Sequence, residues 1–449
     1  MLSPSDNELV TRVGPGTLMG ALMREYWLPA MLSSELPRPD GDPVRVLLLG
    51  EQLIGFRDSS GRVGLVAHAC PHRGASLYFG RNEGDGLRCV YHGWKFDVTG
   101  RCVDMPNEPA ESTFRDKVRA CAYPCVERGG VVFAYMGPRS VPPPLPDIEA
   151  NQLPEGEGEA YAVQRECNWL QALEGDIDTS HFGFLHFGAT RPENVTPGTF
   201  LYYSVADRAP RYSVVDTDYG SMYGAYRPAG PDRRYWRIAQ FLFPCYTHIP
   251  SGALGHQVLT RAWVPMDDHH TMFVSMGARS GRPVPGPSNA QGSTPGERPT
   301  GRPRRVALRT ALRPNTSDWY GRFRLEADAT NDYQIDREWQ RHGDFTGIDG
   351  ILTQDQAVTE SMGPIYDRTG EHLGTSDVMV IRVRRRLLDA ARALADHEVA
   401  PPGVDEASVY ATRSGGVILP EDADWLSATE DLRRAYVDHP ELDLALETR

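Results

Sequence analysis

The sequence predicts an α+β protein, in which a small antiparallel β domain precedes a larger domain with an antiparallel sheet flanked by helices. Short β-branched runs separated by Gly, Asp and Ser begin at Val44 and continue to about residue 137, a pattern typical of a small antiparallel sheet. The proline-dense segment 141–146 marks the end of this domain. Beyond it, helical and strand-like patterns are mixed, and 449 residues suffice for two to three domains with substantial cores.

These observations divide the chain into an N-terminal segment, a small β domain and a large domain, which comprise residues 1–40, 41–146 and 147–449. In the N-terminal segment we expect a helix from Gly16 to Tyr26 that packs on the large domain. The strands expected in the small domain include the runs VRVLLLG, QLIGFRD and GRVGLVAH.

In the large domain, a helix is expected from Asn168 to about Phe187, followed by the strands RYWRIAQFLF and QVLTRAWVPM. A long amphipathic helix is expected from Ser376 to Leu394, with Ser376 as its N-cap. Between residues 281 and 303, eleven of twenty-three residues are Gly or Pro, a composition that favours a mobile surface loop.

The composition narrows the possible partners and location. The net charge of −13 argues against nucleic acid or an anionic membrane surface as a partner. The N-terminus lacks a basic region followed by an apolar one, and no stretch approaches the ~20 apolar residues that span a bilayer. A cytoplasmic protein is therefore expected. The seven scattered cysteines do not suggest a disulfide framework.

Two short boxes in the small domain combine cysteine with histidine. The first is Cys70-Pro-His72, and the second is Cys89-Val-Tyr-His92. Two thiolates and two imidazoles suit either a zinc ion or a Rieske [2Fe–2S] cluster, in which two histidines replace two cysteines on one iron. Each box continues into a glycine-bearing loop, and two such loops can bring both pairs of ligands to one point. The zinc alternative is a site that only stabilises the fold.

A second group of metal-ligand residue types lies in the large domain. Asp178, His181 and His186 form a D-x₂-H-x₄-H pattern. On a regular helix His181 and His186 would point about 140° apart, so both can reach one metal only if the helix is distorted, which Gly183 makes plausible. Two histidines and one carboxylate suit Fe(II) that binds O₂. A third ligand should come from far along the chain, and the candidates are Asp336, Asp344, Asp349, Asp355 and Glu360.

The two boxes and the segment YHGWKFD at residues 91–97 resemble the Rieske signature of the ring-hydroxylating oxygenases. Respiratory-chain Rieske proteins carry an extra cysteine in each box and a serine after His-Gly, whereas this chain has Ala75, Tyr91 and Trp94 at those positions. The resemblance covers nearly the whole chain, and residues 353–377 are similar to the phthalate-dioxygenase branch. A lower reduction potential follows from the missing hydroxyl donor.

The resemblance implies roles for the residues of the large domain. His181 and His186 would be ligands of a mononuclear Fe(II), with Asp355 as the third ligand, chosen by resemblance rather than by spacing. Asp178 would bridge His92 of a neighbouring subunit to His181, since these oxygenases form closed rings such as homotrimers. Three polar residues upstream would support that bridge, namely Asn168, Gln171 and Glu174.

The expected function is that of an oxygenase component, which uses O₂ and electrons from a separate reductase to hydroxylate an aromatic, carboxylated substrate. The reductase is expected to hold a flavin and an iron–sulfur cluster and to use NAD(P)H. Ser180, Arg211 and Arg237 are candidates for binding the substrate, because arginine pairs with a carboxylate through two hydrogen bonds. O-demethylation by the same iron chemistry and a non-catalytic Rieske electron carrier remain the alternatives.

Overall fold

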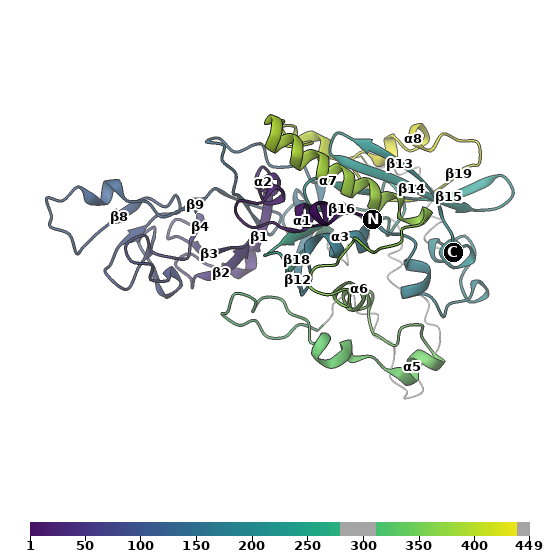
Figure 1. The fold of residues 1–449 in the computed structure, drawn as a ribbon, viewed down its shortest axis with the longest axis horizontal. Helices are drawn as coiled ribbons and strands as arrows, with labels where there is room; N and C mark the ends of the chain where they lie inside the picture. The colour runs from purple at the N-terminus through teal and green to yellow at the C-terminus, as the bar shows by residue number, and fades with distance from the viewer. Residues whose placement is uncertain (279–310, 438–449) are drawn as a thin grey trace.

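The protein, analysed as a computed structural model, is described over residues 1–278 and 311–437, with a small β domain at one end of a larger α+β domain (Figure 1). The predicted fold class is confirmed. The loop expected at residues 281–303 lies outside the described residues. Among the described helices, none is long and apolar enough to cross a membrane.

The small domain consists of two four-stranded antiparallel sheets. The first contains the three expected runs, in the order β2 (Val44–Leu48), β3 (Glu51–Arg57), β4 (Val63–Ala67) and β9 (Ala122–Tyr123). The second contains short strands in the order β5 (Arg81–Asn82), β6 (Leu87–Arg88), β7 (Lys95–Phe96) and β8 (Cys102–Asp104). Phe56 and Val66 of the first sheet pack with Leu87 and Phe96 of the second in one buried cluster. This shared core holds the cysteine–histidine boxes, which lie in loops of the domain.

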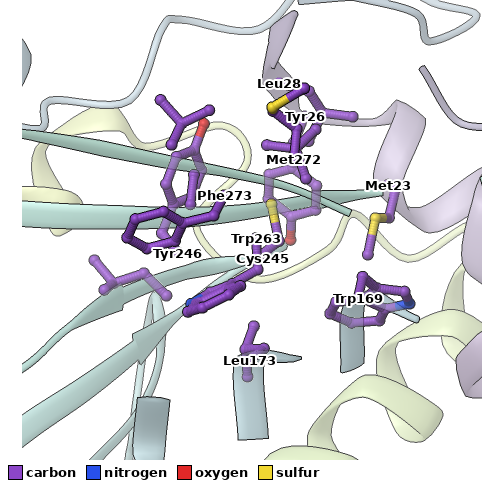
Figure 2. Close-up of a cluster of buried hydrophobic side chains, with 14 of the residues drawn as sticks. Met23, Tyr26, Leu28, Trp169, Leu173, Cys245, Tyr246, Trp263, Met272 and Phe273 are labelled. Carbon is purple, nitrogen blue, oxygen red and sulfur yellow. The ribbon is translucent and has the colours of Figure 1, made fainter. Parts of the chain in front are cut away.

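The N-terminal segment contains two helices and a strand, α1 (Pro4–Thr11), α2 (Leu18–Arg24) and β1 (Trp27–Leu32). The expected helix is present as the shorter α2. β1 pairs with β11 (Val131–Tyr135), which pairs with β10 (Cys125–Arg128), so this sheet joins strands from both sides of the expected boundary at residue 40. Figure 2 shows Met23 and Tyr26 in one buried cluster with Trp169 and Tyr246 of the large domain, and the Tyr246 hydroxyl donates to the Trp27 carbonyl at 3.0 Å.

The large domain is built on an eight-stranded antiparallel sheet with β15 near its centre. The two expected strands are β15 and β17. The strand order is β12 (Gly158–Arg165), β18 (Thr271–Ala278), β17 (Leu259–Pro265), β16 (Tyr246–His248), β15 (Arg233–Leu242), β14 (Gly220–Pro228) and β13 (Arg211–Thr217), and β19 (Gly415–Pro420) also pairs with β15.

Helices pack on this sheet, and the buried cluster around Trp236 and Ile238 includes Trp425 from the C-terminal part of the chain. The helices are α3 (Trp169–Ile177), α4 (Phe200–Ala206), α5 (Arg337–His342), α6 (Ile351–Glu360), α7 (Val378–His397) and α8 (Trp425–Ala428). The long helix α7 runs above the sheet in Figure 1. The expectation that Ser376 caps this helix is wrong, because Ser376 lies in a short 3-10 turn and Asp377 occupies the N-cap position.

The continuous helix expected from residue 168 to 187 is also wrong, because two separate helical pieces occupy this region. α3 ends at Ile177, and Asp178 is extended, with φ −92° and ψ 112°. The Asp178 carboxylate accepts the Ser180 N–H at 2.6 Å, a local bond that competes with helix continuation. A single π-helical turn, Phe182–His186, then follows. Such turns close through i to i+5 hydrogen bonds and are frequent at functional sites.

Candidate metal centres

The two cysteine–histidine boxes form loops with the same backbone hydrogen-bond pattern. In each loop the cysteine N–H donates to the carbonyl five residues later, at 2.8 Å in both cases. The glycine four residues after the cysteine donates back to the cysteine carbonyl, at 2.9 Å from Gly74 and 3.0 Å from Gly93. Both glycines have left-handed backbones, with φ 74° and 79°, a conformation that glycine adopts without steric cost. The two loops therefore hold their cysteines at equivalent backbone positions.

The four side chains of the boxes differ in burial. Cys70 and Cys89 are buried, and burial raises the pKa of the Cys70 thiol to about 11. The His72 and His92 rings are closer to solvent and lie 4.4 Å apart, and His72 stacks on Trp94 at 4.3 Å. The Nδ1 atom of His72 is buried without a hydrogen-bond partner. A buried imidazole nitrogen with no partner fits a metal ligand, and metal binding would deprotonate both thiols.

The spread of these four donors separates a cluster from a single ion. Among the described His, Cys, Asp and Glu side chains, one group of three or more has all its ligand atoms within 4.8 Å of one another. That group lies in the large domain and contains none of the four box residues. The four box residues therefore do not converge as the ligands of one tetrahedral zinc ion do. Two cysteines and two histidines divided between two metal atoms fit a Rieske [2Fe–2S] cluster.

The converging group consists of His181, His186 and Asp355. The two Nε2 atoms are 3.2 Å apart, and Asp355 Oδ1 lies 3.1 Å from His186 Nε2 and 3.6 Å from His181 Nε2. A metal about 2.1 Å from each atom, the length of zinc–imidazole and zinc–carboxylate bonds, fits this triangle. The π-helical turn between the two histidines brings residues five apart to one side. One face of such a metal stays open to other ligands.

Hydrogen bonds fix the tautomer of His186. Its Nδ1 atom lies 2.7 Å from Gln354 Oε1, while Gln354 Nε2 donates to the Ile348 carbonyl at 2.8 Å and to Thr346 Oγ1 at 3.0 Å. Because a backbone carbonyl only accepts, the amide nitrogen of Gln354 must face Ile348 and its oxygen must face His186. The proton of a neutral His186 therefore lies on Nδ1, and Nε2 carries a free lone pair.

Asp178 has the same effect on His181. Its carboxylate lies 3.3 Å from His181 Nδ1, so that nitrogen carries the proton and Nε2 again offers a lone pair. Both side chains are 26% exposed, whereas the His186 side chain is 2% exposed. Ser180, a candidate for substrate binding, contributes its backbone N–H to the Asp178 carboxylate. Of the two histidines of the group, His186 is therefore buried and His181 lies at an accessible edge.

Two lone pairs that face each other at 3.2 Å repel unless a cation lies between them. Burial alone would raise the pKa of the Asp355 carboxyl, but positive charge on His186 and His181 lowers it to about 2. A proton on one imidazole or a metal ion can supply this charge. Since both imidazoles and the carboxylate point to one place, the donor set fits a divalent metal.

The three residues expected to support Asp178 make their described hydrogen bonds elsewhere. Asn168 caps α3 and donates to carbonyls of the N-terminal segment and of the β17–β18 turn, at 2.9 and 2.8 Å. Gln171 donates to two carbonyls at and just after the end of α6, at 2.9 and 2.7 Å. Glu174 accepts from Arg384 at 2.5 Å and from Arg368 at 3.1 Å. These contacts fasten α3 to its surroundings.

The two candidate arginines lie in different environments. Arg237 is 5% exposed, with its guanidinium 4.7 Å from the Phe182 ring centroid and its Nε without a partner among the described residues. Its Nη1 atom lies 3.4 Å from Ser204 Oγ. The Arg211 side chain is 54% exposed and pairs with Asp207 at 2.6 Å. This is the contact of an ordinary surface arginine, so Arg211 does not have the environment expected of a pocket residue.

Two protein families match the chain in separate regions. The Rieske [2Fe-2S] domain matches residues 26–121, and the LigXa C-terminal domain like family matches residues 134–289 and 299–443. The chain belongs to the Rieske non-haem iron oxygenases. It is 48% identical to the 3-chlorobenzoate-3,4-dioxygenase oxygenase subunit of Comamonas testosteroni, over 96% of this chain and 98% of that protein. It is 39% identical to the phthalate 4,5-dioxygenase oxygenase subunit of Pseudomonas putida, over 97% and 96%.

The predicted family, enzyme class and cofactors are confirmed. This Rieske oxygenase carries one [2Fe–2S] cluster and one mononuclear iron, and as an oxygenase subunit it depends on a separate reductase. In fold it is similar to dicamba monooxygenase bound to dicamba, with a TM-score of 0.57 at 18% identity, covering 84% of this chain and 99% of that one.

Proposed function

We propose that Cys70, His72, Cys89 and His92 hold the [2Fe–2S] cluster, and that His181, His186 and Asp355 hold the mononuclear iron. The convergence of three ligand atoms within 4.8 Å supports the second assignment. When bound, the iron supplies O₂ activation, with electrons delivered through the cluster. Asp178 keeps the proton of His181 on Nδ1, away from the iron.

We further propose that the substrate is an aromatic acid, held by Arg237 and Arg227. Arg227 is 1% exposed, its Nη1 atom has no partner among the described residues, and burial beside Arg237 lowers its pKa to about 10. The two arginines lie on the same face of neighbouring strands, since Arg237 pairs with Ala225, two residues before Arg227. Buried charges are costly unless paired. An anionic group of the substrate would supply the missing partner.

The position of these arginines would orient the substrate toward the iron ligands. The Phe182 ring contacts both Arg237 and His186. It lies 4.7 Å from the Arg237 guanidinium and 5.6 Å from the His186 ring. Phe200 lies 5.4 Å from the same guanidinium and 5.4 Å from the Phe182 ring, so the two rings adjoin on one side of Arg237. An arene whose acid group meets Arg237 would therefore rest on aromatic side chains with its ring directed toward the metal site. The relatives named for 3-chlorobenzoate and phthalate also concern aromatic acids.

The substrate proposal is tested by replacing Arg237 and comparing an acid with its neutral amide. Arg237→Gln should raise the KM for a benzoate-type acid about 10- to 100-fold, because hydrogen bonds to charged groups contribute ~1.5–3 kcal/mol. The matched control is Arg211→Gln, which removes an exposed arginine and should leave the KM unchanged. Substrate-dependent O₂ uptake gives the KM. If Arg237→Gln raised the KM for the acid and the KM for the amide equally, the arginine would act only on folding.

We propose ring dioxygenation as the reaction. The two relatives that match 96% and 97% of this chain are named dioxygenases. A 5,5'-dehydrodivanillate O-demethylase oxygenase subunit from Sphingobium is 44% identical, but over 41% of this chain. Product analysis separates the two reactions, because dioxygenation gives a cis-diol and demethylation releases formaldehyde.

We propose that the subunits form a closed ring, a homotrimer, in which Asp178 links His92 of a neighbouring subunit to His181. The partial exposure of Asp178 and His181 supports this arrangement, as does the position of His92 in a surface loop of a projecting domain (Figure 1). The reductase would hold a flavin and an iron–sulfur cluster and use NAD(P)H. None of the seven cysteines forms a disulfide, which is in keeping with a reducing cytoplasm.

A further inference from the structure

The helix that supplies Asp355 also contacts the other end of the His186 ring. Asp355 Oδ1 lies 3.1 Å from His186 Nε2, and Gln354 Oε1 lies 2.7 Å from His186 Nδ1. Consecutive residues of α6 therefore meet the two nitrogens of one imidazole. The ring can neither rotate nor exchange its tautomer without breaking one of these contacts.

Gln354 is itself held in a single orientation. The side chain is 1% exposed, and its amide nitrogen donates to the Ile348 carbonyl and to Thr346 Oγ1. Thr346 Oγ1 also accepts the Ile348 N–H at 3.1 Å. A flipped amide would place its oxygen against the Ile348 carbonyl and its nitrogen against the His186 N–H, and both pairs repel.

We infer that Gln354 is a positioning residue of the mononuclear site, which fixes the tautomer and ring orientation of His186 and thereby sets the affinity for the metal. The inference rests on the proposed assignment of His181, His186 and Asp355 as ligands. A metal-binding histidine needs its second nitrogen protonated and held by an acceptor, and loss of such an acceptor typically costs 10–100-fold in metal affinity. Asp178 provides this contact for His181, and Gln354 provides it for His186.

The test measures binding of Co(II) by calorimetry, on protein that retains its cluster and from which the mononuclear iron has been removed by chelation. Gln354→Met keeps the size of the side chain but removes the acceptor, and it should weaken Co(II) binding about 10–100-fold. Gln354→Glu restores an acceptor oxygen for His186 but places its second oxygen against the Ile348 carbonyl, so it should recover part of the affinity. Thr346→Val removes one partner of the Gln354 amide and should cause a smaller loss.

The matched control is Gln356→Met, on the same helix. Gln356 is 2% exposed and its side chain accepts from Arg165 at 3.0 Å, not from a histidine. This variant should bind Co(II) as the unmodified protein does, and thermal melting of the chelated proteins should show similar losses of stability for both methionine variants.

Two results would overturn the inference: Co(II) binding by Gln354→Met that equals that of Gln356→Met, or binding by Gln354→Glu as weak as that of Gln354→Met. Failure of the unmodified protein to bind one Co(II) would instead refute the ligand assignment on which the inference rests. The two failures are therefore distinguishable, and neither depends on substrate or turnover.

Discussion

The two metal centres of this protein are assembled in opposite ways. The four proposed cluster ligands lie between residues 70 and 92, in two loops with the same backbone hydrogen bonds. The proposed ligands of the mononuclear site include Asp355, which lies 174 positions after His181 and on a different helix. The first centre is a product of local structure, and the second exists only when distant parts of the large domain have packed together.

The imidazoles of the two centres are also held differently. His72 is stacked on Trp94, whose indole N–H donates to Asn107 at 2.7 Å, so packing fixes the ring and leaves Nδ1 free. His181 and His186 are fixed by the hydrogen bonds that their Nδ1–H groups donate to Asp178 and Gln354. Packing suits a cluster that stays in place, whereas hydrogen-bonded imidazoles suit a metal whose remaining positions must exchange ligands.

The largest expected effect comes from disabling each centre separately. His181→Ala should keep the visible cluster spectrum, lose the mononuclear iron and abolish turnover. Cys89→Ser should lose the cluster spectrum, abolish turnover and still bind one Co(II) at the mononuclear site, since the two centres share no ligand. Iron analysis, visible absorption and substrate-dependent O₂ uptake check these outcomes.

Mixing these two inactive variants tests the proposed ring. If His92 of one subunit serves His181 of its neighbour, co-expressed chains should regain part of the activity, because some interfaces join an intact cluster to an intact iron site. If the two centres of one chain worked together instead, every mixed ring would be inactive. Co-expression of His181→Ala with Asp355→Ala, which damage the same site, is the control that should show no recovery.

The local centre is the one that sequence could predict from residues alone. The spacing of Cys70, His72, Cys89 and His92, with a glycine after each box, indicates both the ligand types and the loops. The strands β2, β3 and β4 were likewise visible as short apolar and β-branched runs, because each contains consecutive buried residues. These features depend on near neighbours in the chain.

The other centre needed information that spacing does not contain. The sequence left five carboxylates as candidates for the third ligand, and family resemblance rather than periodicity selected Asp355. The expectation of a continuous helix to residue 187 was wrong, because the Asp178 carboxylate accepts a hydrogen bond from the Ser180 N–H and the helix ends there. Gln354 and Arg227 gave no signal at all, since their roles come from contacts with residues far away in sequence.

The next largest effect concerns the two glycines of the cluster loops. Both have positive φ, but a Cβ on Gly93 would lie 2.5 Å from Pro106 Cγ, whereas a Cβ on Gly74 would meet nothing within 4 Å. Gly93→Ala should therefore destabilise the small domain by about 3 kcal/mol, from the left-handed backbone and the clash together. Gly74→Ala should cost about 1 kcal/mol, from the backbone alone.

Loss of cluster absorbance during heating reports the difference between these glycine variants, with the unmodified protein as reference. Equal shifts for the two variants would mean that Pro106 moves away freely, and that the matching backbone pattern alone determines how each loop tolerates a side chain.

The smallest effect is expected at Gly183, in the π-helical turn between the two histidines. Its backbone is not left-handed, and a Cβ there would lie 3.0 Å from the Ser204 carbonyl oxygen and 3.4 Å from Arg208 Cγ. Alanine favours a helical backbone by ~1 kcal/mol, which offsets a contact that a shift of a few tenths of an ångström relieves. Gly183→Ala should therefore change stability by less than about 1 kcal/mol and keep one Co(II) bound. Loss of the metal would show instead that the turn needs glycine itself, as the cluster loops do.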